Sequence, residues 1–171
     1  MKIVGIDAST NKTGVALFED GAYITHTLID LHNIKDTQVR VPKMMLEICS
    51  CLKQYKPDKI IMEESMLTNN ISTVKLLSQL AGAVLLYASI KDIKFEFALP
   101  THWRKVVGLT QSAKTKREQL KQEAVDAVRQ EYGLEVNDDI AEAILIARSG
   151  FNLERINLSN LINLSKINDD L

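Results

Sequence analysis

The stretch "VGIDASTNKTGVALFEDGAYI" (residues 4–24) decides the fold of this chain. A short β-branched run ends on Asp7, a polar turn follows, a second apolar run begins at Gly14, and the chain turns again at Asp20-Gly21. Short apolar runs bounded by turn residues are typical of strands, and an Asp-Gly pair is typical of a hairpin. We therefore expect three successive antiparallel strands over residues 2–8, 14–20 and 22–29. A strand that ends on an acid is typical either of a phosphate-holding turn or of a metal site.

Beyond this meander, helical and strand patterns alternate. Apolar residues recur at helical intervals over residues 36–55, 70–90, 114–132 and 137–150, and a short helical piece surrounds Trp103. Residues 58–64 and 94–100 are short apolar runs that predict strands. Asn70 or Ser72 is expected to cap the second helix, and Gly133 to end the third. The order predicts an α/β domain with a five-stranded mixed sheet, an antiparallel meander plus two parallel strands, flanked by helices.

The length of 171 residues fits one domain with its own hydrophobic core. We expect residues 1–150 to form this domain and residues 151–171 to be a C-terminal extension of it. Hydrophobic residues make up 46% and charged residues 25% of the chain, which is ordinary for a globular protein. The longest apolar run, residues 80–90, is shorter than a membrane span, and no signal-peptide pattern begins the sequence. A cytoplasmic location is expected.

The cysteines and histidines do not have the spacing of a metal site. Cys49 and Cys51 lie two residues apart in a helical pattern, and His26, His32 and His102 are scattered along the chain. These spacings exclude a CxxC redox motif and make a zinc site improbable. A metal ion would have to be held by oxygen ligands.

Four acids stand at the ends of apolar elements: Asp7, Glu63, Asp139 and Glu142. Taken singly, such acids are explained as helix caps, dipole partners or polar strand exits. Taken together they indicate more, because capping explains neither Asp7 nor Glu63, and both would emerge near the same edge of the sheet if their strands are parallel neighbours. Converging carboxylates repel each other unless a cation lies between them, and oxygen-only ligands favour Mg²⁺ or Mn²⁺. The pattern predicts a metal site.

A basic patch lies between residues 104 and 121, although the whole chain has a net charge of −1. The commoner explanation of a lysine-rich helix is a solvated face. Next to a two-metal site, which can activate a water and stabilise a leaving oxygen, a basic patch would bind phosphates. Lys116 is the candidate for the scissile phosphate, because it opens the helix after a polar loop. The candidate DNA-binding residues are Arg104, Lys105, Lys114, Lys116, Arg117 and Lys121.

Four motifs resemble the RuvC-type Holliday junction resolvases of the RNase H-like superfamily. The first is "VGIDASTNKTGVALF", an aspartate-ended strand with a Thr-Gly turn, and the second is "IIMEESMLTNNISTVKLLSQLAG", an acid-ended strand that leads to a long helix. "VVGLTQSAKTKREQL" resembles the basic loop and helix of the family, and "NDDIAEAILIA" its closing pair of acids. The resemblance covers residues 1–150, and the four motifs in order make it fairly specific.

The resemblance implies an RNase H-like fold and a metal-dependent, structure-selective endonuclease. Such an enzyme resolves Holliday junctions and related branched DNA by paired nicks, in DNA recombination, repair or phage genome processing. The implied cofactor is Mg²⁺, with Mn²⁺ as a substitute, and the implied partners are four-way junction DNA and a second copy of the chain in a homodimer, with no membrane. The implied catalytic residues are the metal-binding acids Asp7, Glu63, Asp139 and Glu142, together with Lys116. Ser9, Thr10 and Thr13 would form the turn beside this site.

The chain departs from the family pattern at several positions. The family's fourth acid is commonly Asp, whereas Glu142 is longer by a methylene. Two of the acids have an acidic neighbour, so Glu64 could serve as the ligand in place of Glu63, and Asp138 in place of Asp139. The bacterial enzymes have an aromatic residue after the second acid, where this chain has Met66-Leu67. Residues 151–171 extend past the typical bacterial end. These features resemble bacteriophage forms, which would act in the cytoplasm of the bacterial host.

Two alternatives belong to other classes. "GIDASTNKTGVAL" also resembles the first phosphate motif of actin, sugar kinases and Hsp70, but those proteins need a second such domain and an Asp-Gly-Gly loop, which this chain lacks. The other alternative is a non-catalytic nucleic-acid-binding protein of RNase H-like fold. The complete set of acids favours activity.

Overall fold

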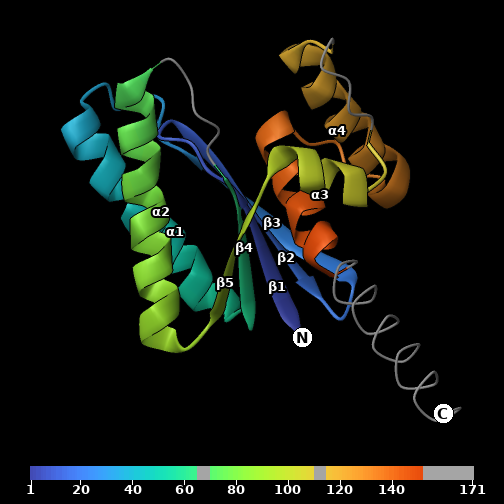
Figure 1. The fold of residues 1–171 in the computed structure, drawn as a ribbon, viewed down its shortest axis with the longest axis horizontal. Coiled ribbons are helices and arrows are strands. Elements are labelled where there is room, and N and C mark those ends of the chain that lie inside the picture. The colour runs from blue at the N-terminus through green and yellow to red at the C-terminus, as the bar shows by residue number, and fades with distance from the viewer. Residues whose placement is uncertain (65–69, 110–114, 152–171) are drawn as a thin grey trace, which may run out of the picture.

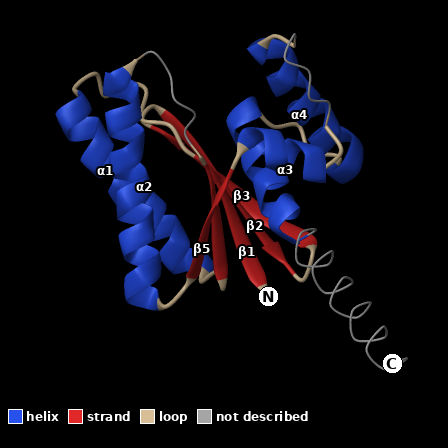
Figure 2. Cartoon of the chain, in the orientation of Figure 1, coloured by secondary structure: helices blue, strands red, loops and turns tan. Residues whose placement is uncertain are grey.

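A five-stranded sheet organises residues 1–64, 70–109 and 115–151, which are the residues that the computed structural model describes (Figures 1 and 2). Its strands lie in the order β3-β2-β1-β4-β5; β1 pairs antiparallel with β2 and β2 with β3, while β1–β4 and β4–β5 are parallel. The predicted mixed sheet is confirmed. The strands are β1 (Lys2–Asp7), β2 (Lys12–Glu19), β3 (Ala22–Asp30), β4 (Lys59–Glu63) and β5 (Lys94–Ala98).

Helices cover both faces of the sheet, so that the domain has three layers (Figure 2). Among the described residues, α1 (Thr37–Tyr55) and α2 (Ile71–Lys91) lie on one face, shown at the left of Figure 1, and the remaining helices lie on the other. These are α3 (Pro100–Val106), α4 (Arg117–Tyr132) and a final helix whose described part covers residues 138–151.

Local capping explains where most helices begin and end. The Asp36 carboxylate accepts a hydrogen bond from the Gln38 N–H (2.8 Å), and the Asn70 side chain accepts one from the Thr73 N–H (3.2 Å). These bonds satisfy N–H groups that have no partner within the first turn. Of the two predicted caps for α2, the structure uses Asn70. Gly133 ends α4 with φ 68°, as predicted from the tolerance of glycine for left-handed backbone.

Among the predicted boundaries that differ from the structure, two have a clear local reason. The strand expected to reach Pro100 ends at Ala98, and Pro100 begins α3 instead, where its missing N–H costs nothing. The helix expected from Lys114 begins at Arg117, because Lys116 has an extended backbone as the N-cap residue (ψ 150°). Lys114 lies outside the described residues.

The two faces of the sheet have different cores. Against α1 and α2 the core is made of large side chains, including the fully buried Met44, Ile48 and Leu80. On the opposite face, a Cβ at Gly5 would collide with the backbone of Ala143 and Ala147 in the final helix. Glycine in the strand therefore allows the final helix to lie directly against the sheet.

The α2 helix exposes an unusually apolar surface. Its side chains Ile71, Leu86 and Ile90 are 62–70% exposed. By length and composition alone, this helix of 21 residues would suffice to cross a membrane, although the sequence prediction considered only residues 80–90. That test is weak support for a span, because core helices of soluble proteins meet it as well. In this structure α2 packs against α1.

Candidate metal centre and nucleic-acid interface

Two of the predicted acids leave the sheet side by side. Asp7 is the last residue of β1 and Glu63 the last residue of β4, and these neighbouring strands are parallel, with Ile6 paired to Met62. The next residue of each strand is the acid. The expectation that parallel pairing brings β1 and β4 to the same edge is therefore confirmed, and Asp7 and Glu63 both line the cavity at that edge.

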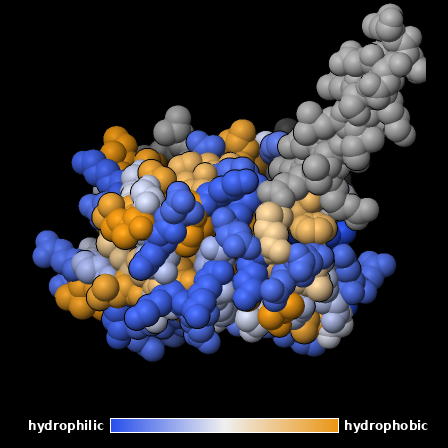
Figure 3. All heavy atoms as spheres, turned by 90° about the horizontal axis from the view of Figure 1, so that it is seen from below, coloured by the Kyte–Doolittle hydropathy of each residue, from blue (hydrophilic) through white to orange (hydrophobic). Residues whose placement is uncertain are grey.

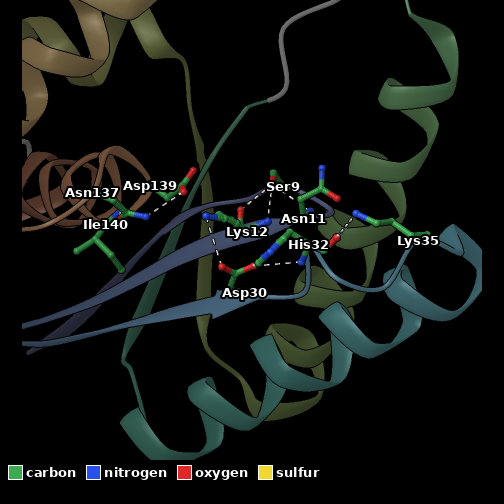
Figure 4. Close-up of polar contacts among 9 residues, drawn as sticks. All are labelled: Ser9, Asn11, Lys12, Asp30, His32, Lys35, Asn137, Asp139 and Ile140. Carbon is green, nitrogen blue, oxygen red and sulfur yellow. Dashed lines mark hydrogen bonds and ion pairs between the residues drawn. The ribbon is translucent and has the colours of Figure 1, made fainter.

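The final helix brings the other two acids to the same place. Asp7 pairs across the sheet with Gly14, and a Cβ on Gly14 would collide with the backbone carbonyl of Asp139. The missing side chain thus lets the start of the final helix lie beside Asp7. Asn137 caps this helix, because its side-chain oxygen accepts the Ile140 N–H (3.0 Å) and its amide donates to Asp139 (3.2 Å) (Figure 4).

A cavity of about 510 Å³ collects the predicted acids, hereafter the acid cavity. Its walls come from the β1–β2 turn, the end of β4, the first turns of α2 and α4, and the final helix. The lining residues are Asp7, Ala8, Ser9, Thr10, Asn11, Glu63, Thr73, Leu76, Leu77, Arg117, Lys121, Asp139 and Glu142.

The acids of this cavity resist ionisation. Burial raises the pKa of Asp7 well above its ordinary range, and the nearby charges of Glu142, Glu63 and Asp139 raise it further. Burial and the charge of Glu142 raise the pKa of Glu63 to about 7, although the Trp103 hydrogen bond opposes this. Burial also raises the pKa of Asp139. Each shift has the sign expected of buried carboxylates that lie close to one another.

Residues of α3 hold two of the carboxylates. The Trp103 indole Nε1 donates to Glu63 Oε2 (2.7 Å), and the buried Arg104 guanidinium forms an ion pair with Glu142. Arg104 also donates to the Leu120 carbonyl (3.0 Å) and lies over the Trp103 ring, 4.8 Å from its centroid. Arg104 is only 5% exposed and is paired with Glu142, which favours a role in holding that acid over the predicted direct contact with DNA.

The donor set fits a divalent metal ion, although the side chains are not gathered around one point. Within residues 1–64, 70–109 and 115–151, no three His, Cys, Asp or Glu side chains form a ready-made metal group. The cavity nevertheless contains four carboxylates, and their nearby charges help to raise the pKa values of Asp7 and Glu63. Carboxylates are the hard oxygen ligands that Mg²⁺ and Mn²⁺ prefer. Binding an ion here would relieve their repulsion.

The structure separates the members of the two doubled acid positions. Glu64 is exposed and does not line the acid cavity, whereas Glu63 does. Asp138 forms an ion pair with Lys121, whereas Asp139 faces the cavity. This arrangement favours Glu63 and Asp139 as the ligands.

The predicted basic residues divide into two groups. Arg117 and Lys121 line the acid cavity. Burial alone would lower the pKa of the Lys121 ammonium, but the hydrogen bond to Asp138 and the surrounding acids raise it. Lys105 and Lys116 are exposed and do not line this cavity, so the choice of Lys116 for the scissile phosphate stays a prediction.

The β1–β2 turn is tied by its own hydroxyls. The Ser9 Oγ donates to the Lys12 carbonyl (2.6 Å) and accepts from the Lys12 N–H (3.0 Å), while the Thr13 Oγ1 donates to the Ser9 carbonyl (2.8 Å). Ser9 and Thr13 are thus turn-formers, as predicted, and Thr10 lines the acid cavity beside them.

Sequence reasoning missed the contributions of Trp103 and Thr73. Trp103 was read only as part of a short helix, although a lone buried tryptophan needs a partner for its indole N–H, and here that partner is Glu63. Thr73 in the first turn of α2 lines the acid cavity, and no sequence pattern distinguishes it from other helix-start residues.

Comparison with known proteins identifies the family. The sequence pattern of the family described as "Crossover junction endodeoxyribonuclease RuvC" matches residues 3–147. The chain belongs to this family. A RuvC protein of Campylobacter concisus is 31% identical over 164 residues, covering 92% of this chain and 100% of that relative. One from Syntrophomonas wolfei is 28% identical over 151 residues, or 86% of each chain.

Solved RuvC-like structures share the fold. Thermus thermophilus RuvC in complex with Holliday junction substrate superposes with a TM-score of 0.73 at 17% identity, over 91% of this chain and 96% of that one. The Fowlpox virus resolvase, in a complex with Holliday junction DNA, gives a TM-score of 0.58 at 16% identity, over 88% and 97% of the two chains. The predicted RNase H-like fold is confirmed.

Membership of the RuvC family confirms the predicted class of enzyme, a crossover junction endodeoxyribonuclease, and disfavours the kinase-like alternative. The family consists of metal-dependent nucleases. The matched relatives named above are bacterial, and a bacteriophage origin stays a prediction.

Proposed function

We propose that this protein is a Mg²⁺-dependent endonuclease that resolves four-way DNA junctions by paired nicks. The observation that carries the proposal is the convergence of Asp7, Glu63, Asp139 and Glu142 on one cavity with Arg117 and Lys121 at its rim. Acids alone would repel a phosphodiester, and basic residues alone would bind it without cleaving it. The combination supports hydrolysis of a phosphodiester, with Mn²⁺ as a substitute ion.

Each group has a role that follows from its position. Asp7, Glu63, Asp139 and Glu142 would hold the metal ions. Metal ions bound by these acids would supply activation of a water and stabilisation of the leaving oxygen in an in-line displacement. Trp103 and Arg104 position Glu63 and Glu142 through the contacts described above.

Two cations at the rim of the acid cavity would orient the substrate. Arg117 and Lys121 lie where a phosphate approaching the acids can accept hydrogen bonds from them. Lys116, one residue before Arg117, would contact the neighbouring backbone. Lys105 and Lys114 complete the predicted DNA-binding surface outside the cavity.

A homodimer is part of this proposal, since two nicks in opposite strands require two acid cavities. The exposed side chains of Leu86 and Ile90 on α2 offer an apolar surface that a second copy would cover. In Figure 3, orange apolar residues appear on the side of the molecule where α1 and α2 are found, and also on the opposite side. Sedimentation should therefore show a dimer, and Leu86→Glu should shift it to monomer.

The proposal places the nuclease domain at residues 1–150, with residues 151–171 as its C-terminal extension. We further propose that the protein acts in the cytoplasm, where junction DNA forms during recombination and repair.

The direct test is cleavage of a synthetic four-way junction by the purified protein in Mg²⁺. We expect symmetric nicks in opposite strands, no cleavage in EDTA, and loss of cleavage in Asp7→Asn with junction binding retained. The matched control is Asp92→Asn. Asp92 lies at the C-terminal end of α2 and does not line the acid cavity. Binding without cleavage by the parent protein would favour the non-catalytic alternative, and parent-rate cleavage by Asp7→Asn would remove the catalytic assignment.

A further inference from the structure

A second cavity adjoins the acid cavity on the side of β3 and α1. It has a volume of about 640 Å³ and shares Ser9, Asn11, Lys121 and Asp139 with the acid cavity. The rest of its wall is rich in cations, which come from the β1–β2 turn and from the segment that enters α1. These cations are Lys12, Lys35 and Arg40.

Arg40 differs from the other two cations because it is buried. Its side chain lies in the first turn of α1, and the residue is only 9% exposed. Its Nη1 donates to the carbonyls of Ile34 (2.5 Å) and Lys35 (3.3 Å), while its buried Nε has no hydrogen-bond partner. No carboxylate among the described residues forms an ion pair with it. Burying a charged group without an opposite charge is costly, so an anion that binds beside Arg40 would be stabilised.

Lys35 adds a second cation without an acidic partner among the described residues. It is exposed, and its Nζ donates to the His32 carbonyl (3.2 Å), as Figure 4 shows. Lys12 is paired with Asp30 (3.4 Å), and Asp30 is also bonded to His32 (2.5 Å). Asp30 is therefore engaged by Lys12 and His32, while Lys35 and Arg40 have no carboxylate partner among the described residues.

The acids of the second cavity do not cancel this charge. Asp138 is paired with Lys121, and Asp139 belongs equally to the acid cavity, where the metal ions are proposed to bind. A tetrahedral anion in the second cavity could accept hydrogen bonds from a guanidinium and an ammonium together, which is the usual chemistry of phosphate recognition.

We propose that the second cavity binds a backbone phosphate of the DNA strand that is cut, next to the scissile phosphate, through Lys35 and Arg40. This inference rests on the proposed function, because it assumes that the acid cavity receives the scissile phosphate. The shared wall of the two cavities makes the phosphate a near neighbour of the scissile one on the same strand. The site would fix the direction in which the strand crosses the acids.

The main experiment combines a protein change with a change in the DNA. A series of junctions is made, each with one uncharged methylphosphonate at a different position near the expected cleavage site. Binding of each junction is measured in metal-free buffer for the parent protein, for Lys35→Ala and for Lys53→Ala. Lys35 is exposed, so its loss should not impair folding, and Lys53 is an exposed lysine at the other end of α1 that serves as the matched control.

The expected result is coupling at one phosphate. Lys35→Ala should weaken junction binding several-fold and reduce the slope of log affinity against log salt by about one. One methylphosphonate should weaken binding by the parent but not by Lys35→Ala, whereas its effect should persist in Lys53→Ala. Additive effects at every position would overturn the inference.

A second experiment does not depend on cleavage or on DNA. Inorganic phosphate is titrated into the metal-free protein while backbone amide signals are followed by NMR. We expect saturable shifts at Lys12 and Lys35 in the parent and their loss in Lys35→Ala. Absence of these shifts in the parent would also overturn the inference.

The two experiments separate the inference from the proposed function. Phosphate binding and coupling in a protein that never cuts a junction would support the site and reject the nuclease activity. Junction cleavage without coupling would support the activity and reject the site. Phosphate-dependent shifts without coupling would identify a site for free anions, and the DNA assignment would be wrong.

Discussion

On one face of the sheet, α1 and α2 bury large side chains such as Ile48, Leu80 and Val84. On the other face, the final helix lies so close to the strands that a single methyl group on Gly5 or Gly14 would meet its backbone. Large side chains hold a helix away from a sheet, whereas small ones let the two backbones approach.

The difference shows how the fold serves the site. Away from the cavities, the first face needs mainly apolar volume, so many combinations of residues would satisfy it. The second face has to set the position of Asp139 and Glu142 relative to Asp7, and backbone contact does this more rigidly than side-chain packing. We therefore expect substitutions that destabilise the two faces equally to differ in their effect on the cleavage rate, with the larger effect on the face that carries the final helix.

The largest effect on the cleavage rate should come from changing Glu63, a proposed metal-binding residue of the acid cavity. Glu63→Gln keeps an acceptor for the Trp103 indole but removes the charge that a metal ion requires. Cleavage at saturating Mg²⁺ should fall about 1000-fold, equivalent to about 4 kcal/mol of activation free energy. The adjacent and exposed Glu64 provides the control, and Glu64→Gln should cleave at the parent rate. Single-turnover rates measure both, and a larger loss in Glu64→Gln would reverse the ligand assignment.

The direct test of the comparison pairs Gly14→Ala with Val84→Ala. Gly14→Ala introduces a Cβ against the Asp139 carbonyl and should destabilise the fold by about 2 kcal/mol through overpacking. Val84→Ala leaves a cavity beneath α2 and should also cost about 2 kcal/mol.

Only Gly14→Ala should slow cleavage per folded molecule, by about tenfold or more, because only it displaces the acids. Urea unfolding gives the two stability losses, and cleavage rates at a temperature where both variants are folded give the comparison. Equal cleavage rates at equal stability would show that the close packing of the final helix does not position the acids.

The smallest effect is a pH dependence of stability in the metal-free protein. The pKa of Glu63 is about 7 in the folded state and close to 4.5 when the chain is unfolded. The folded state therefore binds more protons between these values, and its stability should fall as the pH rises from 5 to 8, by about 1–2 kcal/mol. Asp7 acts in the same direction, because its pKa is also raised.

Urea unfolding in EDTA at pH 5 and pH 8 measures this decline. Glu63→Gln should reduce the slope, whereas Glu64→Gln should leave it unchanged. Mg²⁺ should stabilise the protein more at pH 8 than at pH 5, because ionised carboxylates bind the ion. Stability that rises with pH in EDTA would contradict the burial of these acids.

Much of the fold followed from local patterns. The apolar runs of β1, β2 and β4 and the helical periods of α1 and α2 depend on residues that are near one another in sequence, so they could be read directly. The prediction of a boundary was wrong where a local pattern is compatible with two structures. Pro100 can follow a strand or begin a helix, and here it begins α3.

The sequence by itself determined the element order, the mixed character of the sheet, and the four acids from which a site could be built. The tertiary structure showed that β1 and β4 are the parallel neighbours that bring Asp7 and Glu63 together. Only the tertiary structure decided that Arg104 pairs with Glu142, that Trp103 binds Glu63, and that Arg117 and Lys121 rather than Lys116 line the acid cavity. These partners lie 38 and 40 residues apart along the chain. Periodicity and turn chemistry act over a few residues, whereas the partner of a buried charge is chosen by the packing of whole elements, which no local pattern encodes.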